Sequence, residues 1–164
     1  KRRRDSEPIP LLLASVGDID RHAANVPPAA RALTEALWPG PLTLVVQRAG
    51  NVPDAVTGGT DNVGLRVPDS WIPRAIAREL GTAITGTSAN ISGSPPTTTA
   101  EAVRAQLGDD VDLVVDGGQT PGVASTVVQV GEDGPRILRQ GAISARAVEE
   151  LCGIAVQGGA GRRD

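Results

Sequence analysis

The sequence contains no phenylalanine, tyrosine or methionine, and its only aromatic side chains are two tryptophans. Recognition of single-stranded nucleic acid by base stacking is therefore disfavoured, and the core must be aliphatic. The single cysteine, Cys152, excludes a disulfide framework, and with only one histidine, His22, it also excludes a Cys/His zinc site. No apolar run approaches the length of a membrane span and no signal peptide is evident, so we expect a soluble, cytoplasmic protein with no membrane partner.

The chain has 164 residues, of which 40% are hydrophobic, and a formal net charge of −3. This length favours one domain, large enough to bury roughly two-thirds of its unfolded surface. We find no internal repeat and no linker between two cores. The sequence predicts one domain over residues 1–152, followed by a glycine-rich, disordered tail over residues 153–164.

Strands and helices are predicted to alternate along the chain. Helices are expected over 18–37, interrupted at Pro27-Pro28, over 72–80, from a Thr98-x-x-Glu101 capping box to Leu107, and from a Ser144 cap to Leu151. Strands are expected over 10–14, 42–47, 63–67, 82–85, 111–115, 126–130 and 136–138, the last two as a hairpin. This order predicts an α/β domain with a mixed sheet.

Two polar segments are candidates for a binding site. Thr87–Gly93 comes directly after a predicted strand. The segment carries short hydroxyl and amide side chains, which can hydrogen-bond phosphate or carbonyl oxygens. A polar turn that satisfies its own backbone is the alternative. Asp116–Thr126 is a glycine-rich loop whose amides could approach an anion, although it is neither a Walker A nor a GxGxxG motif. A flexible connection explains it equally well.

The arginines give a further signal. Arg66 and Arg139 lie within or at the end of apolar strands, where an unpaired guanidinium is costly, so each is expected to have an anionic partner. That partner is either an internal carboxylate or a substrate. The basic run Lys1–Arg4 is typical of a solvated tail or a weak nucleic-acid contact, and the alternative is that it neutralises a polyphosphate.

Other chemically versatile residues have simpler interpretations. His22 lies in a polar stretch without a catalytic partner and is predicted to be a surface residue. Cys152 is interpreted as a small packing residue, and Trp38 and Trp71 as packing bulk, although Trp38 could also form the wall of a pocket.

Several ordered motifs together resemble the YrdC-like family, the threonylcarbamoyl-AMP synthases. The match extends from Lys1 to about Ile143. It comprises Lys1, Arg3 and Pro8, the stretch Trp38-Pro39-Gly40-Pro41-Leu42-Thr43, the strand Val63–Pro68, the segment Thr87–Gly93, the segment Ser125–Val128, and Arg139-Gln140-Gly141-Ala142-Ile143.

The resemblance implies a twisted, mixed α/β sheet with helices around a concave basic cavity. It implies a nucleotidyltransferase that uses L-threonine, bicarbonate and ATP to form threonylcarbamoyl-adenylate and pyrophosphate. The product serves the threonylcarbamoyl modification of an adenosine in tRNA, so tRNA and tRNA-modification proteins are further implied partners. ATP is a substrate, and Mg²⁺ is expected to bind chiefly through its phosphates.

The resemblance also implies roles for individual residues, with no covalent nucleophile and no metal site of the protein's own. Threonine binding is implied for Arg66, Gly86 and Ser125. ATP binding is implied for Lys1, Arg3, Asn62, Ser88, Asn90, Pro96 and Arg139.

The sequence departs from the family pattern at its beginning. The family's first strand and helix, with a Pro-Thr-x-Thr-x-Tyr-Gly-Leu stretch that helps to hold threonine, should precede Lys1, and some members have a histidine where Leu12 stands. We therefore expect a truncated chain that is weakly active or inactive alone. The alternatives are a YrdC-like module that binds nucleotide or RNA without synthase activity, a carbamoyl-transfer domain of the hydrogenase-maturation type, and an inactive fragment.

Overall fold

The structure is a computed structural model that describes residues 7–158 of the chain. Within this part, seven strands form one sheet in the order β4-β1-β3-β2-β5-β6-β7. The strands are β1 (Leu11–Leu12), β2 (Leu42–Gln47), β3 (Asn62–Arg66), β4 (Ile84–Thr85), β5 (Thr126–Gly131), β6 (Gly134–Arg139) and β7 (Gln157–Gly158).

The sheet is mixed, as the sequence predicts. Strand β1 is parallel to β3, β2 to β5, and β6 to β7. The pairs β1–β4, β2–β3 and β5–β6 are antiparallel. The central strands β3, β2 and β5 are thus joined by one antiparallel and one parallel ladder, which together fix their relative register.

Helices form where the sequence provides start and stop signals. Pro28 occupies the first turn of its helix, where a missing N–H is tolerated. Gly81 and Gly153 end two other helices in the left-handed conformation. The helical elements are η1 (Val16–Arg21), α1 (Pro28–Leu37), α2 (Asp54–Thr57), α3 (Trp71–Leu80), α4 (Ala100–Leu107), η2 (Gly108–Asp110) and α5 (Ala145–Cys152).

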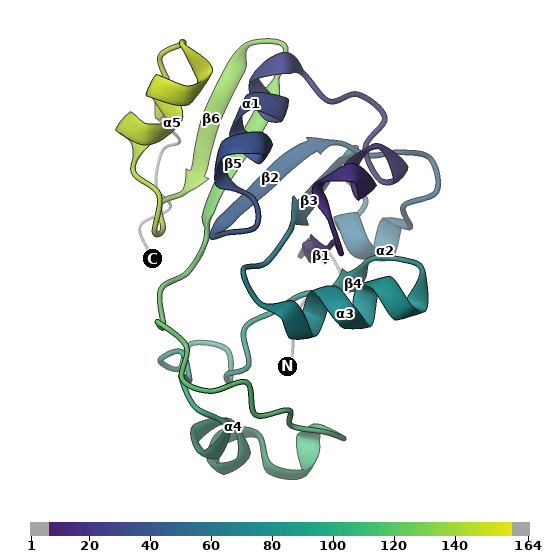
Figure 1. The fold of residues 1–164 in the computed structure, drawn as a ribbon, viewed down its shortest axis with the longest axis vertical. Coiled ribbons are helices and arrows are strands. Elements are labelled where there is room, and N and C mark those ends of the chain that lie inside the picture. The colour runs from purple at the N-terminus through teal and green to yellow at the C-terminus, as the bar shows by residue number, and fades with distance from the viewer. Residues whose placement is uncertain (1–6, 159–164) are drawn as a thin grey trace.

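The hydrophobic core lies on one face of the sheet. Alternate residues of the central strands point to this face, where Ala30 and Leu33 of α1 and Val148 of α5 pack against them. Figure 1 shows α1 beside β2 and β5, and α5 beside β6. The strand residues of this core are Leu42, Leu44, Val46, Val63, Leu65, Val128 and Val130.

Residues 89–123, here called the α4 lobe, lie apart from the sheet at one end of the long axis (Figure 1). Among the described residues, the hydrogen bonds of this lobe connect only its own members. Examples are the bond from the backbone N–H of Ile91 to Gln106 Oε1 (2.8 Å) and that from the N–H of Thr120 to the carbonyl of Thr98 (2.9 Å).

Two sequence predictions fail in the α4 lobe. The strand expected over 111–115 is absent, and Leu113 is 79% exposed. The β-prone residues of segment 111–115 lie away from the sheet, where no strand edge is available for pairing. The helix cap is Thr99 rather than Thr98, because the hydroxyl of Thr99 accepts the N–H of Ala102 at 3.2 Å.

Three further expectations need correction. Trp71 is 76% exposed at the start of α3 and does not provide packing bulk. His22 is half-buried rather than superficial. The predicted tail over 153–164 begins too early, because β7 pairs with β6 and Val156 packs against the core. Residues 159–164 of that tail lie outside the described part.

Candidate functional site

The strand residues that do not point into the core form the floor of a cavity. In β2 and β3 the neighbours of core residues, such as Thr43, Val45, Gly64 and Arg66, face the opposite side of the sheet. A cavity of about 700 Å³ lies over this face. The α4 lobe contributes Ser92 and Val123 to its lining.

Six of the predicted site residues line this cavity. They come from β3, from the segment after β4, and from both sides of the β5–β6 hairpin, and they are Asn62, Arg66, Gly86, Ser88, Ser125 and Arg139. Asn90 and Pro96 belong to the α4 lobe and are not part of the lining. Lys1 and Arg3 lie outside the described residues.

Arg66, at the end of β3, is held by a backbone carbonyl. Its Nε donates to the carbonyl of Gly40 at 2.9 Å. Gly40 follows the cis peptide bond Trp38–Pro39, and a Cβ at this position would lie 2.3 Å from the carbonyl oxygen of Leu37. Burial, followed by the positive charge of Arg139, lowers the pKa of Arg66 from its ordinary value.

Arg139 reaches the cavity because of a β-bulge. In β5, Val127 pairs with Arg139 while Val128 pairs with Ile137, so Leu138 is an extra residue in β6. Ile137 packs against the core, and strict alternation would turn Arg139 to the same side. The bulge instead places both Leu138 and Arg139 on the cavity side.

Ser125 holds the Arg139 guanidinium in place. Arg139 Nη2 donates to the Ser125 carbonyl at 2.9 Å and to Ser125 Oγ at 3.1 Å. Ser125 Oγ also lies 2.8 Å from Thr43 Oγ1. Both hydroxyl side chains are buried on the cavity floor.

The loop after β6 is fastened to the start of β5 by Thr126. Its fully buried hydroxyl accepts the N–H groups of Gly141 and Ile143 and donates to the carbonyl of Ile143 at 2.8 Å. A Cβ on Gly141 would lie 2.4 Å from the carbonyl oxygen of Ala124. The close approach therefore requires glycine and positions the Ser125–Arg139 pair.

The ionisable lining of the cavity comprises Glu7, Arg66 and Arg139 among the described residues. Within residues 7–158, neither arginine forms an ion pair with a carboxylate. The sequence left open whether the anionic partner of each arginine is an internal carboxylate or a substrate. In the described part of the chain, no internal carboxylate fills this role. The arrangement leaves room for an anionic ligand between the two cations.

Asn90 occupies a distinct position within the α4 lobe. Its Nδ2 donates to the carbonyl of Ser94 at 2.7 Å, which closes a local turn. Its Oδ1 is buried and has no hydrogen-bond partner among residues 7–158. The turn matches the alternative interpretation of this segment, in which the polar residues satisfy their own backbone.

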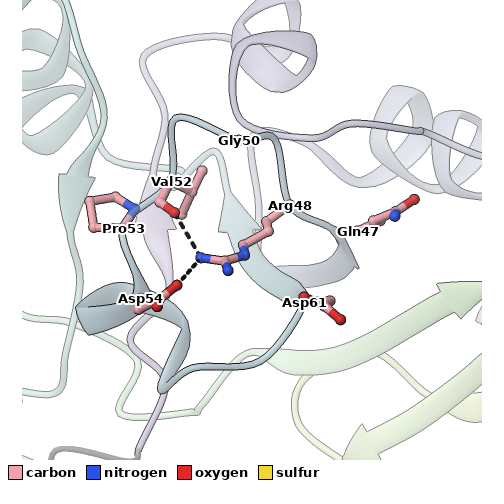
Figure 2. Close-up of a pocket in the computed structure, with 7 residues that line it drawn as sticks. All are labelled: Gln47, Arg48, Gly50, Val52, Pro53, Asp54 and Asp61. Atoms are coloured by element: carbon pink, nitrogen blue, oxygen red, sulfur yellow. Dashed lines mark hydrogen bonds and ion pairs between the residues drawn. The ribbon is translucent and has the colours of Figure 1, made fainter.

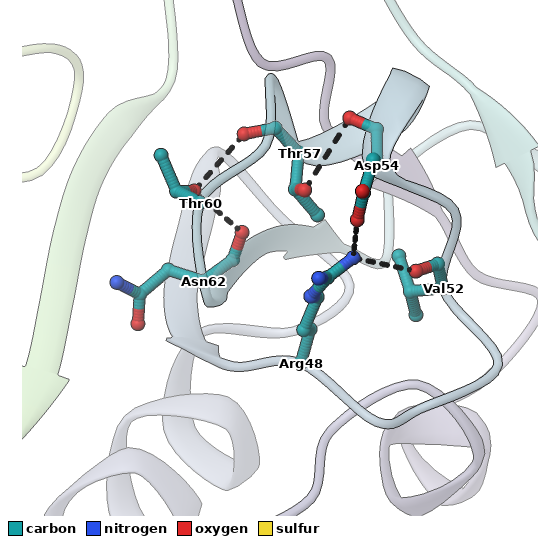
Figure 3. A network of polar contacts seen from close by, with 6 residues as sticks. All are labelled: Arg48, Val52, Asp54, Thr57, Thr60 and Asn62. Carbon is teal, nitrogen blue, oxygen red and sulfur yellow. Dashed lines mark hydrogen bonds and ion pairs between the residues drawn. The ribbon is translucent and has the colours of Figure 1, made fainter.

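A polar network supports the edge of the cavity at Asn62. The Thr60 hydroxyl lies 2.9 Å from the carbonyl of Thr57 and 3.3 Å from that of Asn62, so it joins α2 to the start of β3 (Figure 3). At the start of α2, Asp54 accepts a hydrogen bond from Nη1 of Arg48, the residue that follows β2 (Figure 3). Thr60 and the side chain of Asn62 are thereby placed on the cavity wall.

A second hollow, of about 350 Å³, lies between β2 and α2, and Figure 2 shows its lining. Arg48 extends into it, but Arg48 Nη1 already donates to the carbonyl of Val52 at 3.0 Å and to Asp54 Oδ1 at 2.5 Å. Because this guanidinium already pairs with a carboxylate of the protein, the hollow is a weaker candidate for anion binding than the larger cavity.

Sequence reasoning missed several cavity residues, among them Thr43, Thr60 and Gln129. Thr43 and Gln129 lie inside strands that are otherwise apolar. The available signal was the period of two in these strands, because a polar residue between two core positions faces the opposite side of the sheet.

The remaining reactive residues lie outside the cavity lining. Cys152 packs against the core, and burial raises the pKa of its thiol.

No group of three or more His, Cys, Asp or Glu side chains in residues 7–158 could hold a metal ion. In the same residues, no helix combines the length and apolar character needed to cross a membrane. The fold and the cavity thus define an α/β domain whose candidate site lies on the open face of a mixed sheet.

Comparison with known proteins identifies the family. The family Sua5_yciO_yrdC, described as "Telomere recombination", matches residues 1–141. The chain is 35% identical over 154 residues to the threonylcarbamoyl-AMP synthase of Pyrococcus abyssi, covering 93% of this chain and 45% of the relative. It is 36% identical over 158 residues to the threonylcarbamoyl-AMP synthase of Bacillus subtilis, with the same two coverages of 93% and 45%.

A solved structure agrees with this assignment. The crystal structure of Pyrococcus abyssi Sua5 complexed with L-threonine matches with a TM-score of 0.88 at 34% identity, covering 94% of this chain and 46% of that one. The chain belongs to the Sua5/YciO/YrdC family. It spans less than half the length of these relatives.

Proposed function

We propose that the protein is an L-threonylcarbamoyladenylate synthase, which consumes L-threonine, bicarbonate and ATP and releases pyrophosphate. The observation that carries this proposal is the pair Arg66 and Arg139, which line one cavity without a carboxylate partner among the described residues. Both the carboxylate of threonine and the phosphates of ATP are anions that a guanidinium can bind through two parallel hydrogen bonds. The named relatives and the threonine complex support the same assignment.

The threonine end of the site is assigned to Arg66, Gly86 and Ser125. Arg66 keeps one N–H group on Gly40 and has its terminal nitrogens available for a carboxylate. Gly86 and Ser125 line the same cavity and supply backbone and hydroxyl groups. Burial of Arg66 strengthens an ion pair with threonine because the surrounding dielectric constant is low.

The nucleotide end is assigned to Arg139 and to the polar residues near it. Asn62 and Ser88 line the cavity. Asn90 and Pro96, which lie in the α4 lobe outside the lining, are proposed to contribute to the same end. Lys1 and Arg3, which lie outside the described residues, complete the expected contacts with the phosphates.

The chemistry needs positioning and charge neutralisation rather than a covalent nucleophile. The neutral threonine amine forms a bond to the carbon of CO₂ derived from bicarbonate, giving a carbamate, and the hydroxide lost by bicarbonate leaves as water with one amine proton. A carbamate oxygen then forms a bond to the α-phosphorus of ATP, and the bond to the β-phosphate oxygen breaks, so that pyrophosphate carries away the electron pair. Two arginines stabilise the negative charge of the reacting groups.

Mg²⁺ is proposed to enter with ATP. The cavity offers one carboxylate, Glu7, among its described residues, which is fewer than a protein-only site needs, whereas a triphosphate supplies several oxygens. The ion neutralises phosphate charge when it is bound. The adenylate product is proposed to pass to tRNA-modification proteins in the cytoplasm.

Pyrophosphate release from ATP tests the proposal. Release should require L-threonine and bicarbonate together, and Arg66→Gln should reduce it by about tenfold or more, because the charged hydrogen bonds to the carboxylate are lost. The matched control is Arg146→Gln, since Arg146 is an exposed arginine paired with Glu150 on α5. The full-length Bacillus subtilis relative serves as the positive control for the assay.

Direct binding measurements separate the alternatives. Calorimetry with L-threonine and with a non-hydrolysable ATP analogue reports on the site even if turnover is slow. Binding of ATP without threonine-dependent pyrophosphate release would favour the nucleotide-binding module over the synthase. Failure to bind either ligand would favour the inactive fragment.

A further inference from the structure

Thr43 lies at the centre of the cavity floor. Leu44 pairs with Leu65 in the antiparallel ladder, so Thr43 and Arg66 are the next residues on the two strands. On its other side, Thr43 pairs with Val127, which in turn pairs with Arg139. Thr43 thus occupies the row that connects the two cavity arginines, and its side chain is 5% exposed.

Hydrogen-bond accounting gives Thr43 a specific partner. A guanidinium can only donate, so Arg139 Nη2 uses one lone pair of Ser125 Oγ at 3.1 Å. The bond between Ser125 Oγ and Thr43 Oγ1, at 2.8 Å, uses one of the two hydroxyl protons. Whichever hydroxyl donates, one O–H of the pair is left to point towards a ligand.

A ligand in this position would meet several donors. Thr43 lies in the strand row between Arg66 and Arg139, and the free O–H and the two guanidinium groups all donate hydrogen bonds. Without the Thr43 hydroxyl, the Ser125 hydroxyl would still accept from Arg139 but would lose its second partner, so its orientation would be less restricted. The Thr43 contact therefore limits the orientation of Ser125 before a ligand arrives.

We propose that Thr43 is a positioning residue that orients the Ser125 hydroxyl for binding of the amino-acid substrate. The inference rests on the proposed function, because it takes the Ser125 end of the cavity as the threonine site. Thr43 acts through Ser125 and need not touch threonine itself.

Two substitutions of Thr43 separate the role of the hydroxyl from that of side-chain shape. Thr43→Val keeps the branched shape and removes the hydroxyl, whereas Thr43→Ser keeps the hydroxyl. We expect Thr43→Val to raise KM for threonine by about five- to tenfold, with a smaller effect on KM for ATP, and Thr43→Ser to remain within about twofold of wild type. Thr34→Val is the matched control, because Thr34 is a buried threonine in α1 outside the cavity lining.

A double-mutant cycle tests whether Thr43 acts through its partner. Ser125→Ala removes the hydroxyl that Thr43 orients, so adding Thr43→Val to Ser125→Ala should cause no further loss of threonine affinity. Dissociation constants for threonine, measured by calorimetry, complete the cycle even for variants that turn over slowly. Thermal unfolding checks that the variants remain folded.

The outcomes are distinct. Unchanged threonine affinity in Thr43→Val, additive effects in the cycle, or equal impairment of Thr43→Ser and Thr43→Val would each overturn the role of Thr43. If wild type binds threonine but releases no pyrophosphate, the synthase proposal fails while the binding cycle still decides the role of Thr43. A wild-type protein that binds neither threonine nor ATP would overturn both.

Discussion

Arg66 and Arg139 share one cavity, and the charge of Arg139 adds to burial in lowering the pKa of Arg66. Among the described residues no carboxylate pairs with either guanidinium. The folded chain thus holds two like charges in a common cavity, and a bound anion would relieve their repulsion.

This repulsion predicts stabilisation by anions. Inorganic pyrophosphate at about ten times its Kd should add about 1.4 kcal/mol to the free energy of unfolding. For a domain of this size that corresponds to a rise in Tm of roughly 3–6 °C. Arg139→Gln should reduce the rise by at least half, because it removes one of the two arginines that the described residues place in the cavity.

Differential scanning fluorimetry checks this prediction, with sodium chloride at matched ionic strength to correct for screening. Arg146→Gln should keep the full rise, since Arg146 lies on α5 outside the cavity. An undiminished rise in Arg139→Gln would show that pyrophosphate binds elsewhere.

Gly141→Ala should strongly destabilise the fold. The new Cβ would lie 2.4 Å from the carbonyl oxygen of Ala124 and 2.5 Å from the backbone nitrogen of Thr126, and backbone atoms cannot easily move away. We expect a loss of about 2–4 kcal/mol in the free energy of unfolding. Urea denaturation measures this loss.

Gly131→Ala is the matched control for this substitution. Gly131 ends β5 in the same hairpin, and no atom of residues 7–158 outside its immediate chain neighbours lies within 4 Å of a Cβ built there. Its stability should remain within about 0.5 kcal/mol of wild type. Equal losses in the two variants would contradict the steric explanation.

The pair Arg48–Asp54 should matter more for stability than the pair Arg146–Glu150. Arg48 is 23% exposed and also donates to the carbonyl of Val52, so Arg48→Met should cost about 1–2 kcal/mol in the free energy of unfolding. Arg146 is 86% exposed, so Arg146→Met should cause little measurable change. Chemical denaturation of both variants in one buffer compares them, and the opposite order would refute the prediction.

His22 should make stability depend on pH. Burial and then the charge of Arg21 lower the pKa of His22 below 6.5, and Asp18 only partly opposes them. As the pH falls through about 6.5, the unfolded chain binds a proton before the folded chain does, so the free energy of unfolding decreases. Above this window His22 is neutral in both states and contributes no pH dependence.

Denaturation curves between pH 7.5 and pH 5.5 measure this effect of His22, with about 6.5 as the reference pKa of the unfolded chain. His22→Gln should show a smaller decrease over the same range than wild type. An identical pH dependence in the two proteins would mean that other groups cause it.

The sequence predicted the central sheet well because its strands have strong local signals. The strand 42–47 has the predicted bounds, and β3 and β5 differ by one residue at their ends. Arg66 could be recognised as a candidate site residue because it is a charged residue in an apolar strand, and the structure places it in the cavity lining. The same alternation predicts which side of the sheet it faces.

Other parts of the site depend on long-range structure. Arg139 faces the cavity only because β6 contains an extra residue relative to β5, and such a bulge leaves no clear pattern in the sequence. Thr43 is inconspicuous in an apolar strand until the structure places Ser125 2.8 Å away. The strand expected over 111–115 failed because strand propensity has no effect without a neighbouring strand edge.

The self-contained hydrogen bonding of the α4 lobe has a consequence for variation within the family. Because residues 89–123 bond only among themselves in the described structure, changes in loop length there would not shift the register of any strand. The sheet can therefore keep Arg66, Thr43 and Arg139 in place while the lobe diversifies. Chimaeras that exchange this segment between relatives would alter the rim of the cavity and leave its floor intact.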